Sequence, residues 1–191
     1  MQIAFIPLGL SDDLMNIPLS EIDSELLEDI KQDLTVLDSG FRLFEKNYGE
    51  GADWVMLLAI LNGITTVFLL GEKIDKGIKG WVEIGKRIKS IISKCDRFYI
   101  DIDAARIFGL QHLSKEEKIK SIRIIMESEL AIKDLSGMIK DRNPIDFIAK
   151  PFSVYFITYE INYNLIISLG IRSDGMIEEH YRFDRRNFIP F

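Results

Sequence analysis

An uncharged, largely apolar stretch at residues 54–71 dominates the pattern of hydrophobic and polar positions along the chain. Its length of about 18 residues reaches the lower limit for a membrane-spanning helix. Acidic residues before it and basic residues after it would then place its C-terminal side in the cytoplasm. Asn62 argues against a span, because it falls at the centre, where lipid offers its side-chain amide no partner. A spanning helix is therefore an alternative and not the favoured structure.

Two further structures fit the same stretch. A tight turn at Asn62-Gly63 would separate two apolar strands, since Asn-Gly readily adopts the positive φ angles of a hairpin turn. Residues 54–61 do not favour a strand, because Met, Leu and Ala prefer helices and the segment shows no alternation. A helix up to Asn62-Gly63 followed by a strand is a hybrid of the two. We favour a buried helix over about residues 52–70, apolar on all sides because protein surrounds it.

An amphipathic helix is predicted directly after this stretch, from Glu72 to Lys94. Its apolar residues recur at helical spacing and form one stripe: Ile74, Ile78, Trp81, Val82, Gly85, Ile88 and Ile92. Seven basic and three acidic side chains lie mainly off that stripe, so the helix could rest on anionic lipid or on a nucleic-acid backbone. The favoured interpretation is a surface helix whose stripe packs on the core and whose lysines are solvated.

A strand, a helix and a second strand are predicted for the N-terminal part. The apolar run at residues 1–7 indicates the first strand. Ser20 is placed to cap a helix whose inner positions are Ile22, Leu26, Leu27, Ile30 and Leu34. A turn at Asp38-Ser39-Gly40 then precedes a strand over residues 41–46.

A further strand and a further helix are predicted in the middle of the chain. Residues 98–103 alternate between two sets of side chains, as in a strand. Ser114 and Glu117 match a capping box for a helix from Lys115 to about Ile132. The inner face of that helix would consist of Ile119, Ile122, Met126 and Leu130.

The C-terminal third changes to strands. Three runs rich in β-branched and aromatic residues, at 152–161, 165–171 and 176–183, predict an antiparallel meander. In the last run the inward positions are Ile177, Tyr181 and Phe183. The outward positions are Glu178, His180 and Arg182, which we interpret as an ordinary polar surface.

The fold class that these elements predict is α+β. It is a mainly antiparallel sheet with a C-terminal three-stranded meander, covered by a buried apolar helix and amphipathic helices. We expect a single domain over residues 1–191, with a helical region to about residue 140 and the β-meander over 152–183.

Composition and charge narrow the class of protein. The chain has 191 residues, 47% of them hydrophobic, and a formal net charge of −6, which argues against general nucleic-acid binding. The charge is uneven, because the first 50 residues carry eleven acidic and three basic side chains. This acidic N-terminal part and the basic helix at 72–94 could attract each other within the fold or between subunits.

The small number of cysteines and histidines limits location and chemistry. Cys95 is the only cysteine, so no intramolecular disulfide can form, as is usual in the cytoplasm. With one cysteine and two histidines, no closed Cys/His zinc site fits within one subunit. The sequence contains no glycine-rich phosphate loop or nucleophile elbow, and we expect no cofactor.

Asp101 and Asp103 are the strongest candidates for catalysis or metal binding. On a strand, both carboxylates and Tyr99 would share one face, with the carboxylates about 7 Å apart, and could hold a divalent metal for phosphoryl transfer. An apolar strand that ends in Asp-x-Asp resembles the first motif of haloacid-dehalogenase-type phosphatases. The motif lies mid-chain here, and the family's downstream lysine and second acidic motif have no clear counterpart. The favoured interpretation is a solvated strand face or a helix cap where the strand ends.

Six residues are candidates for contact with a partner. Glycines in a predicted helix indicate close approach of another backbone, and Gly85 on the apolar stripe is the best candidate for a close helix contact. Arginines beside aromatic rings in the C-terminal tail could anchor a partner, although a tail packed on its own domain is favoured. The candidates are Gly77, Trp81, Gly85, Arg185, Arg186 and Phe188.

Three functions are compatible with the sequence. The favoured one is a non-catalytic cytoplasmic protein–protein interaction module, such as an adaptor, a regulator or an immunity-type protein, that binds a protein partner or itself. The first alternative is a metal-dependent enzyme that acts on a phosphate-bearing substrate through Asp101 and Asp103. The second alternative is a membrane-attached effector or sensor built on residues 54–71, so membrane contact is the less favoured kind of interaction.

Overall fold

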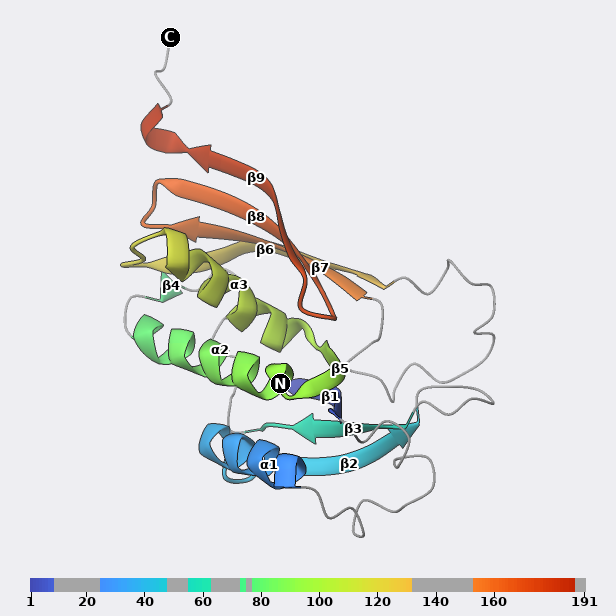
Figure 1. Cartoon of the computed structure of the whole chain (residues 1–191). Coiled ribbons are helices and arrows are strands. Elements are labelled where there is room, and N and C mark those ends of the chain that lie inside the picture. Colours follow the sequence, from blue (N-terminus) through green and yellow to red (C-terminus); the bar gives the residue numbers. More distant parts are fainter. Residues whose placement is uncertain (9–24, 48–54, 63–72, 75–76, 132–152, 188–191) are drawn as a thin grey trace.

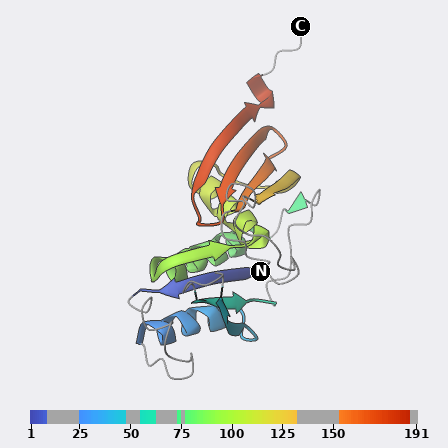
Figure 2. The same cartoon turned by 90° about the vertical axis from the view of Figure 1, so that its right-hand side faces the viewer.

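The structure is a computed structural model that describes residues 1–8, 25–47, 55–62, 73–74, 77–131 and 153–187. Within these ranges, two antiparallel sheets and three α-helices are stacked (Figures 1 and 2). In Figure 1 the C-terminal sheet is at the top, α3 lies beneath it, α2 lies beneath α3, and β1, β2, β3 and α1 are at the bottom. The fold is therefore α+β with antiparallel sheets, as the sequence predicted.

The N-terminal sheet has the strand order β2-β3-β1-β5 and is antiparallel throughout. Its strands are β1 (Gln2–Pro7), β2 (Arg42–Asn47), β3 (Val55–Ile60) and β5 (Cys95–Ile100). The strands predicted at residues 1–7 and 41–46 are thereby confirmed. Every residue of the central strand β1 is buried, which explains why its sequence is an almost continuous apolar run.

The buried helix predicted over residues 52–70 is wrong, because Val55–Ile60 forms strand β3 between β1 and β2. The strand's inner residues Met56–Ala59 are all buried, so both of its faces are covered and no alternation is visible. A short apolar run of this kind cannot be distinguished from a buried helix by periodicity. Residues 63–72, which would hold the second strand of the alternative hairpin, lie outside the described residues. Among the described residues, no helix is both long and apolar enough to cross a membrane.

Helices α1 (Glu25–Leu37) and α2 (Ile78–Ser93) lie beside the N-terminal sheet. The buried residues of α1 are Leu27, Ile30 and Leu34, at the spacing that the sequence predicted. Lys94, which follows α2, binds Asp33 of α1 with 2.8 Å between Nζ and Oδ2. The predicted attraction between the acidic N-terminal part and the basic helix therefore occurs within the fold at this pair.

Helix α2 is shorter than the predicted segment 72–94, because Lys73–Ile74 forms the short strand β4 and the helix begins after Gly77. Gly77 has φ +84°, a left-handed conformation that glycine adopts without strain. Gly85 is buried against α3 (Ile102–Glu116), where an added Cβ would lie 2.8 Å from the Cβ of Gln111. The close helix contact that the sequence predicted at Gly85 is confirmed.

Helix α3 is the buried helix of this fold, and it lies between the two sheets (Figure 1). All its residues from 104 to 111 are buried, so its sequence lacks a clear apolar stripe. The helix predicted from Lys115 to about Ile132 is wrong, because α3 ends at Glu116 and Ile122–Ala131 forms strand β6. The Ser114 hydroxyl donates to the Gln111 carbonyl inside α3 and caps no further helix.

The C-terminal sheet has the strand order β4-β6-β7-β8-β9 and is also antiparallel throughout. Strands β7 (Ser153–Ile161), β8 (Leu165–Arg172) and β9 (Ile177–Asp184) are the predicted meander. In the turn between β7 and β8, Asn162 and Tyr163 both have positive φ angles, 51° and 64°. This conformation is typical of a tight hairpin turn.

The inner face of the C-terminal sheet packs on α3 and on the end of β5. Tyr155 and Tyr159 of β7 are among the largest fully buried side chains. The Tyr155 hydroxyl donates to the Ile100 carbonyl at 2.9 Å, and the Tyr159 hydroxyl donates to the Arg106 carbonyl at 3.0 Å. Burial raises the pKa of both phenols, so both remain donors. These two bonds fix β7 to the backbone at and beyond the end of β5.

A β-bulge in β6 changes which residues face α3. Ile124 pairs with Tyr159 and Met126 with Thr158, so Ile125 is an extra residue without a counterpart in β7. As a result Ile124 faces α3, whereas Met126 faces away from it and is 59% exposed.

A second bulge in β9 has the same effect. Ser168 pairs with Tyr181 and Leu169 with Glu179, so His180 is the extra residue. The prediction that Tyr181 and Phe183 point inward and Arg182 outward is therefore wrong. The two rings stack on each other on the outer face, while Arg182 faces inward to Glu116 and Glu117 at the C-terminus of α3. The predicted polar trio is divided between the two faces.

Two glycine substitutions in α2 test the close packing against α3. Gly85→Ala should lower the free energy of unfolding by roughly 1–2 kcal/mol, because the new methyl group would press on Gln111 and Ile107. Gly80→Ala is the matched control, since no atom lies within 4 Å of its added Cβ and alanine favours the helix. Urea unfolding should show Gly80→Ala unchanged or stabilised by up to about 1 kcal/mol. Equal effects at both positions would contradict this account.

Candidate functional site

Asp101 lies at the start of a helix and not on a strand face. Strand β5 ends at Ile100, and Asp101 is the N-cap of α3. Its Oδ1 accepts a hydrogen bond from the backbone N–H of Ala104 at 2.9 Å, and its Oδ2 accepts one from the backbone N–H of Gln2 at 2.7 Å. The side chain is buried, so both carboxylate oxygens are occupied by amides of α3 and β1. The helix-cap alternative for Asp101 is confirmed.

Asp103, in the first turn of α3, belongs to an ion-pair network. Its carboxylate lies 2.7 Å from Nη1 of Arg106 and 3.7 Å from the N-terminal amine of Met1. Arg106 also binds Glu127 of β6 with two nitrogens, at 2.9 Å from Nε and 2.6 Å from Nη2. A bidentate pair of this kind is strong and directional. It joins the N-terminal half of α3 to the C-terminal sheet.

The predicted metal geometry of Asp101 and Asp103 is wrong, because the two carboxylates do not share a strand face and have different partners. Among the described residues, no group of three or more His, Cys, Asp or Glu side chains is arranged to hold a metal ion. Burial raises the pKa of the Asp101 carboxyl to about 6, although the hydrogen bond from Ala104 opposes this shift. Its geometry is that of a structural cap.

Cys95 is placed as a structural residue. Its thiol lies 3.2 Å from the Ile91 carbonyl at the end of α2, to which it donates. Burial raises the pKa of this thiol to about 12, with Lys94 opposing the shift. The thiolate that nucleophilic chemistry requires is therefore scarce near neutral pH.

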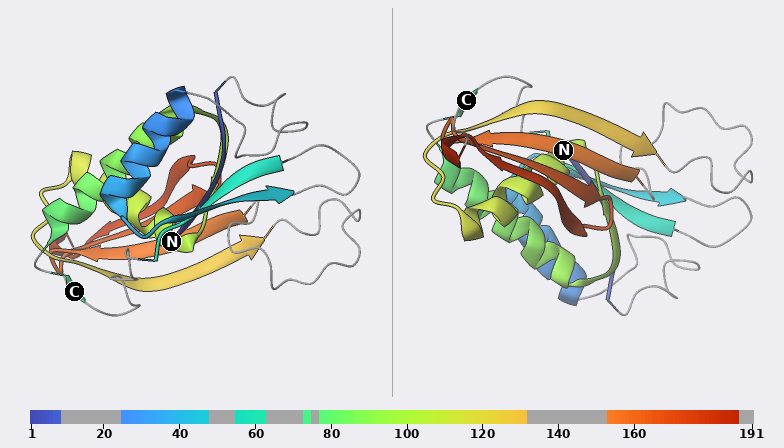
Figure 3. Two further views of the ribbon diagram at one scale, coloured as in Figure 1. Left: turned by 90° about the horizontal axis from the view of Figure 1, so that it is seen from below. Right: turned by 90° about the horizontal axis from the view of Figure 1, so that it is seen from above.

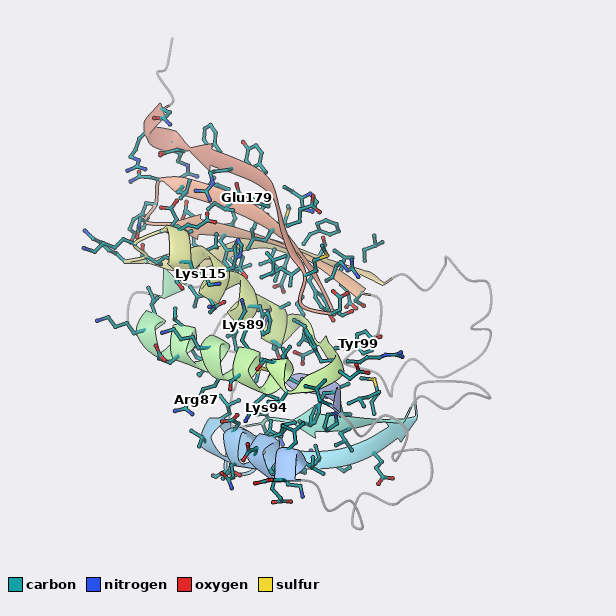
Figure 4. The ribbon with its side chains drawn as sticks, in the orientation of Figure 1. Arg87, Lys89, Lys94, Tyr99, Lys115 and Glu179 are labelled. Carbon is teal, nitrogen blue, oxygen red and sulfur yellow. The ribbon has the colours of Figure 1, made fainter. Side chains whose placement is uncertain are left out.

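The basic residues of α2 are partly used within the fold. Lys86 pairs with Glu83 at 2.6 Å. The ammonium of Lys89 lies 5.5 Å from the centre of the Phe108 ring, and burial together with Lys115 lowers the pKa of Lys89. Figure 4 shows Lys89 where α2 and α3 run beside each other. These contacts support the surface helix that the sequence favoured, with its apolar stripe on the core.

A cavity of about 490 Å³ lies where β5 meets the ends of β7 and β8. Its lining arginines have acidic neighbours: Arg172 pairs with Asp174, and Arg97 lies 4.0 Å from Asp96. The charges that line the cavity therefore balance, and no class of ligand is selected by charge. The remaining lining residues are Phe98, Tyr99, Ser153, Val154 and Ser173.

The outer face of the C-terminal sheet, which points away from α3, carries an apolar surface that we name the outer patch. The pairing registers place its members on that face in four neighbouring strands. In the right-hand view of Figure 3, no described helix lies in front of these strands. The outer patch consists of Met126, Leu130, Val154, Phe156, Ile166, Tyr181 and Phe183.

The outer patch is exposed at its edges and uncharged at its centre. Met126, Leu130 and Tyr181 are 59%, 57% and 54% exposed. Between Met126 and Tyr181 the surface is lined by Thr158 and Ser168, whose hydroxyls bond to each other at 2.6 Å. An exposed apolar group of this extent on one sheet face is typical of an interaction surface.

Five of the six interaction candidates from the sequence are described, and they lie outside the outer patch. Gly77 begins α2, Gly85 contacts α3, and Trp81 is half-buried against the core. Arg185 lies at the border of the outer face, 3.0 Å from Glu160, and Arg186 pairs with Asp184 at 2.6 Å. The last candidate, Phe188, lies outside the described residues.

The outer patch was not predicted, because strand β6 was predicted as a helix and the side chains of strand β9 were assigned to the wrong faces. Met126 and Leu130 were placed on the inner face of a helix, and Tyr181 was placed inward. A signal for the patch was nevertheless present in the meander. Val154, Phe156 and Ile166 are apolar at positions that alternate with the core positions of β7 and β8, where a solvated face would be polar.

A pH series tests the buried carboxyl of Asp101. Its pKa is about 6 in the folded protein, against 3.8 for a solvated aspartate, so the folded state holds this proton more tightly than the unfolded state. The stability contributed by the protonated group is present below about pH 4 and is lost as the pH rises through 6. Relative to Asp101→Asn, which does not titrate, the parent should lose up to about 3 kcal/mol between pH 4 and 7. Urea unfolding of both proteins at each pH gives the unfolding free energy of the parent minus that of the variant. A value that stays constant or rises with pH would contradict the raised pKa.

Comparison of the chain with protein-family models, with curated proteins and with solved structures gave no match.

Proposed function

We propose that this chain is a non-catalytic protein–protein interaction module of the cytoplasm, and that the outer patch is its binding surface. The observation that carries the proposal is an apolar sheet face that no described element covers. Apolar faces of sheets are normally buried against another layer, and the inner face of this sheet already has such a layer in α3. The outer face is therefore the one available for a partner.

The proposal is also supported by what the reactive side chains do. Asp101 caps a helix, Asp103 neutralises Arg106, and the Cys95 thiol is bonded and of high pKa. Each of these groups has a structural task that accounts for its position. A cytoplasmic location is supported by the single cysteine, which cannot form an intramolecular disulfide.

Charge substitution in the outer patch tests the proposed binding surface. The double variant Met126→Glu/Tyr181→Glu places two charges at positions that are more than half exposed, so the fold should tolerate them. Binding of a stoichiometric protein partner or of a second copy should weaken at least tenfold, because the charges would have to be desolvated in the interface. Capture from extract of the native cell, with the bound amounts quantified, measures the change.

Val36→Glu is the matched control for this experiment. Val36 is 61% exposed on α1, far in the fold from the outer face, and receives one new charge of the same sign. The control should bind like the parent. A double variant that binds as well as the parent would overturn the assignment of the surface, and a parent that binds neither a partner nor itself would overturn the proposed function.

A further inference from the structure

We propose that the occupant of the outer patch is a second copy of this chain, packed face to face as in a β-sandwich. This inference rests on the proposed function and names its partner. Four properties of the outer face support it, namely its charge, its dimensions, the polar groups within it and the nature of its edge.

The charge of the outer face suits contact with itself. Each copy carries a formal net charge of −6, so two copies repel each other overall, and an uncharged contact surface adds no close like-charge pairs to that repulsion. The outer patch is uncharged, the exposed Glu178 of the same face lies on the outermost strand β9, and the charged groups at one end of the face are paired within the chain. Glu160 binds Arg123 at 2.6 Å and Arg185 at 3.0 Å. An uncharged apolar face does not select a basic partner. It also places no like charges in contact when two identical acidic chains meet through it.

The dimensions of the face match a sheet better than a helix or a single peptide. Four strands spaced about 4.8 Å apart and about eight residues long give a face of roughly 19 Å by 26 Å. Its area is roughly 500 Å², so two copies together bury about 1,000 Å², near the lower limit for a specific interface. A helix about 10 Å wide would cover only half of this width.

The polar groups within the face are ready for burial. The hydroxyls of Thr158 and Ser168 satisfy each other at 2.6 Å. The ring of His180 fills the space above Gly170, where an added Cβ would clash with Nε2, and it contacts the Phe156 ring with 5.5 Å between centroids. A contact with a second copy can therefore cover these two hydroxyls with one of them already donating to the other.

The outer edge of β9 disfavours a second mode of association, in which the edge strands of two sheets pair with each other. Strand β9 is the last strand of its sheet, and it carries Glu178, Glu179 and Arg182 together with the bulge at His180. Charged side chains and bulges protect a sheet edge from pairing with another strand. Face-to-face packing, in which two sheets lie about 10 Å apart, uses no strand edge and is not opposed by these features of β9.

Sedimentation equilibrium of the purified parent between about 1 µM and 1 mM tests the inference, over a range that covers typical weak and strong dimers. The parent should change from 22.0 kDa to twice that mass, and Val36→Glu should do the same. Met126→Glu/Tyr181→Glu should shift the midpoint of dimerisation at least tenfold upward in concentration. Leu130→Ser is a second, milder variant that should also weaken the dimer, and circular dichroism of each variant verifies its fold.

The outcomes separate this inference from the proposed function. A parent that stays at 22.0 kDa at the highest concentration overturns the second copy as occupant. The proposed function then stands if the parent binds a different stoichiometric partner in cell extract and Met126→Glu/Tyr181→Glu does not. A dimer that persists unchanged in folded Met126→Glu/Tyr181→Glu and Leu130→Ser overturns the face-to-face assignment. A parent that neither dimerises nor binds any partner overturns both.

Discussion

A helix that is buried between two sheets must have its free amides and its charged side chains satisfied inside the protein, and the rest of this structure depends on how α3 meets that constraint. At its N-terminus, the Asp101 carboxylate accepts from an amide of α3 and from an amide of β1, so the cap also fixes the first strand. One turn later, Arg106 reaches Glu127 in β6. At the C-terminus, Glu116 and Glu117 bind Arg182 of β9. Helix α3 is thus tied to the C-terminal sheet at both ends.

These ties explain why the C-terminal sheet has bulges in β6 and β9. An unbroken alternation would not carry both the apolar and the polar side chains of each strand to the faces that they occupy. The extra residue Ile125 allows Ile124 and Glu127 to face α3 in the same strand. The extra residue His180 does the same for Ile177 and Arg182 in β9. Each bulge delivers a charged partner to α3 and, as a consequence, turns apolar side chains to the outside.

Much of the fold could be predicted from the sequence, and each failure has a physical cause. The helix around Leu27, Ile30 and Leu34 was predicted correctly because one covered face gives a visible period. The meander was predicted correctly because turn residues separate its runs of β-branched and aromatic residues. The prediction for strand β3 was wrong because both of its faces are covered. Tertiary packing there outweighs the helix propensity of its Met, Leu and Ala residues. In β6 the bulge after Ile124 interrupted the period of two, and the remaining apolar positions imitated helical spacing.

The candidate residues and the outer patch differ in how far the sequence could reveal them. Asp101 and Asp103 were accessible to prediction as a cap and a first-turn residue, since an aspartate before a run with Ala104 and Ala105 is a common helix start. The outer patch was harder to predict, because the bulges in β6 and β9 determine which side chains of these strands face outward. Its apolar residues are exposed because the polar residues next to them are needed by α3. The proposed second copy would cover these residues without placing like charges in contact, because the outer patch itself is uncharged.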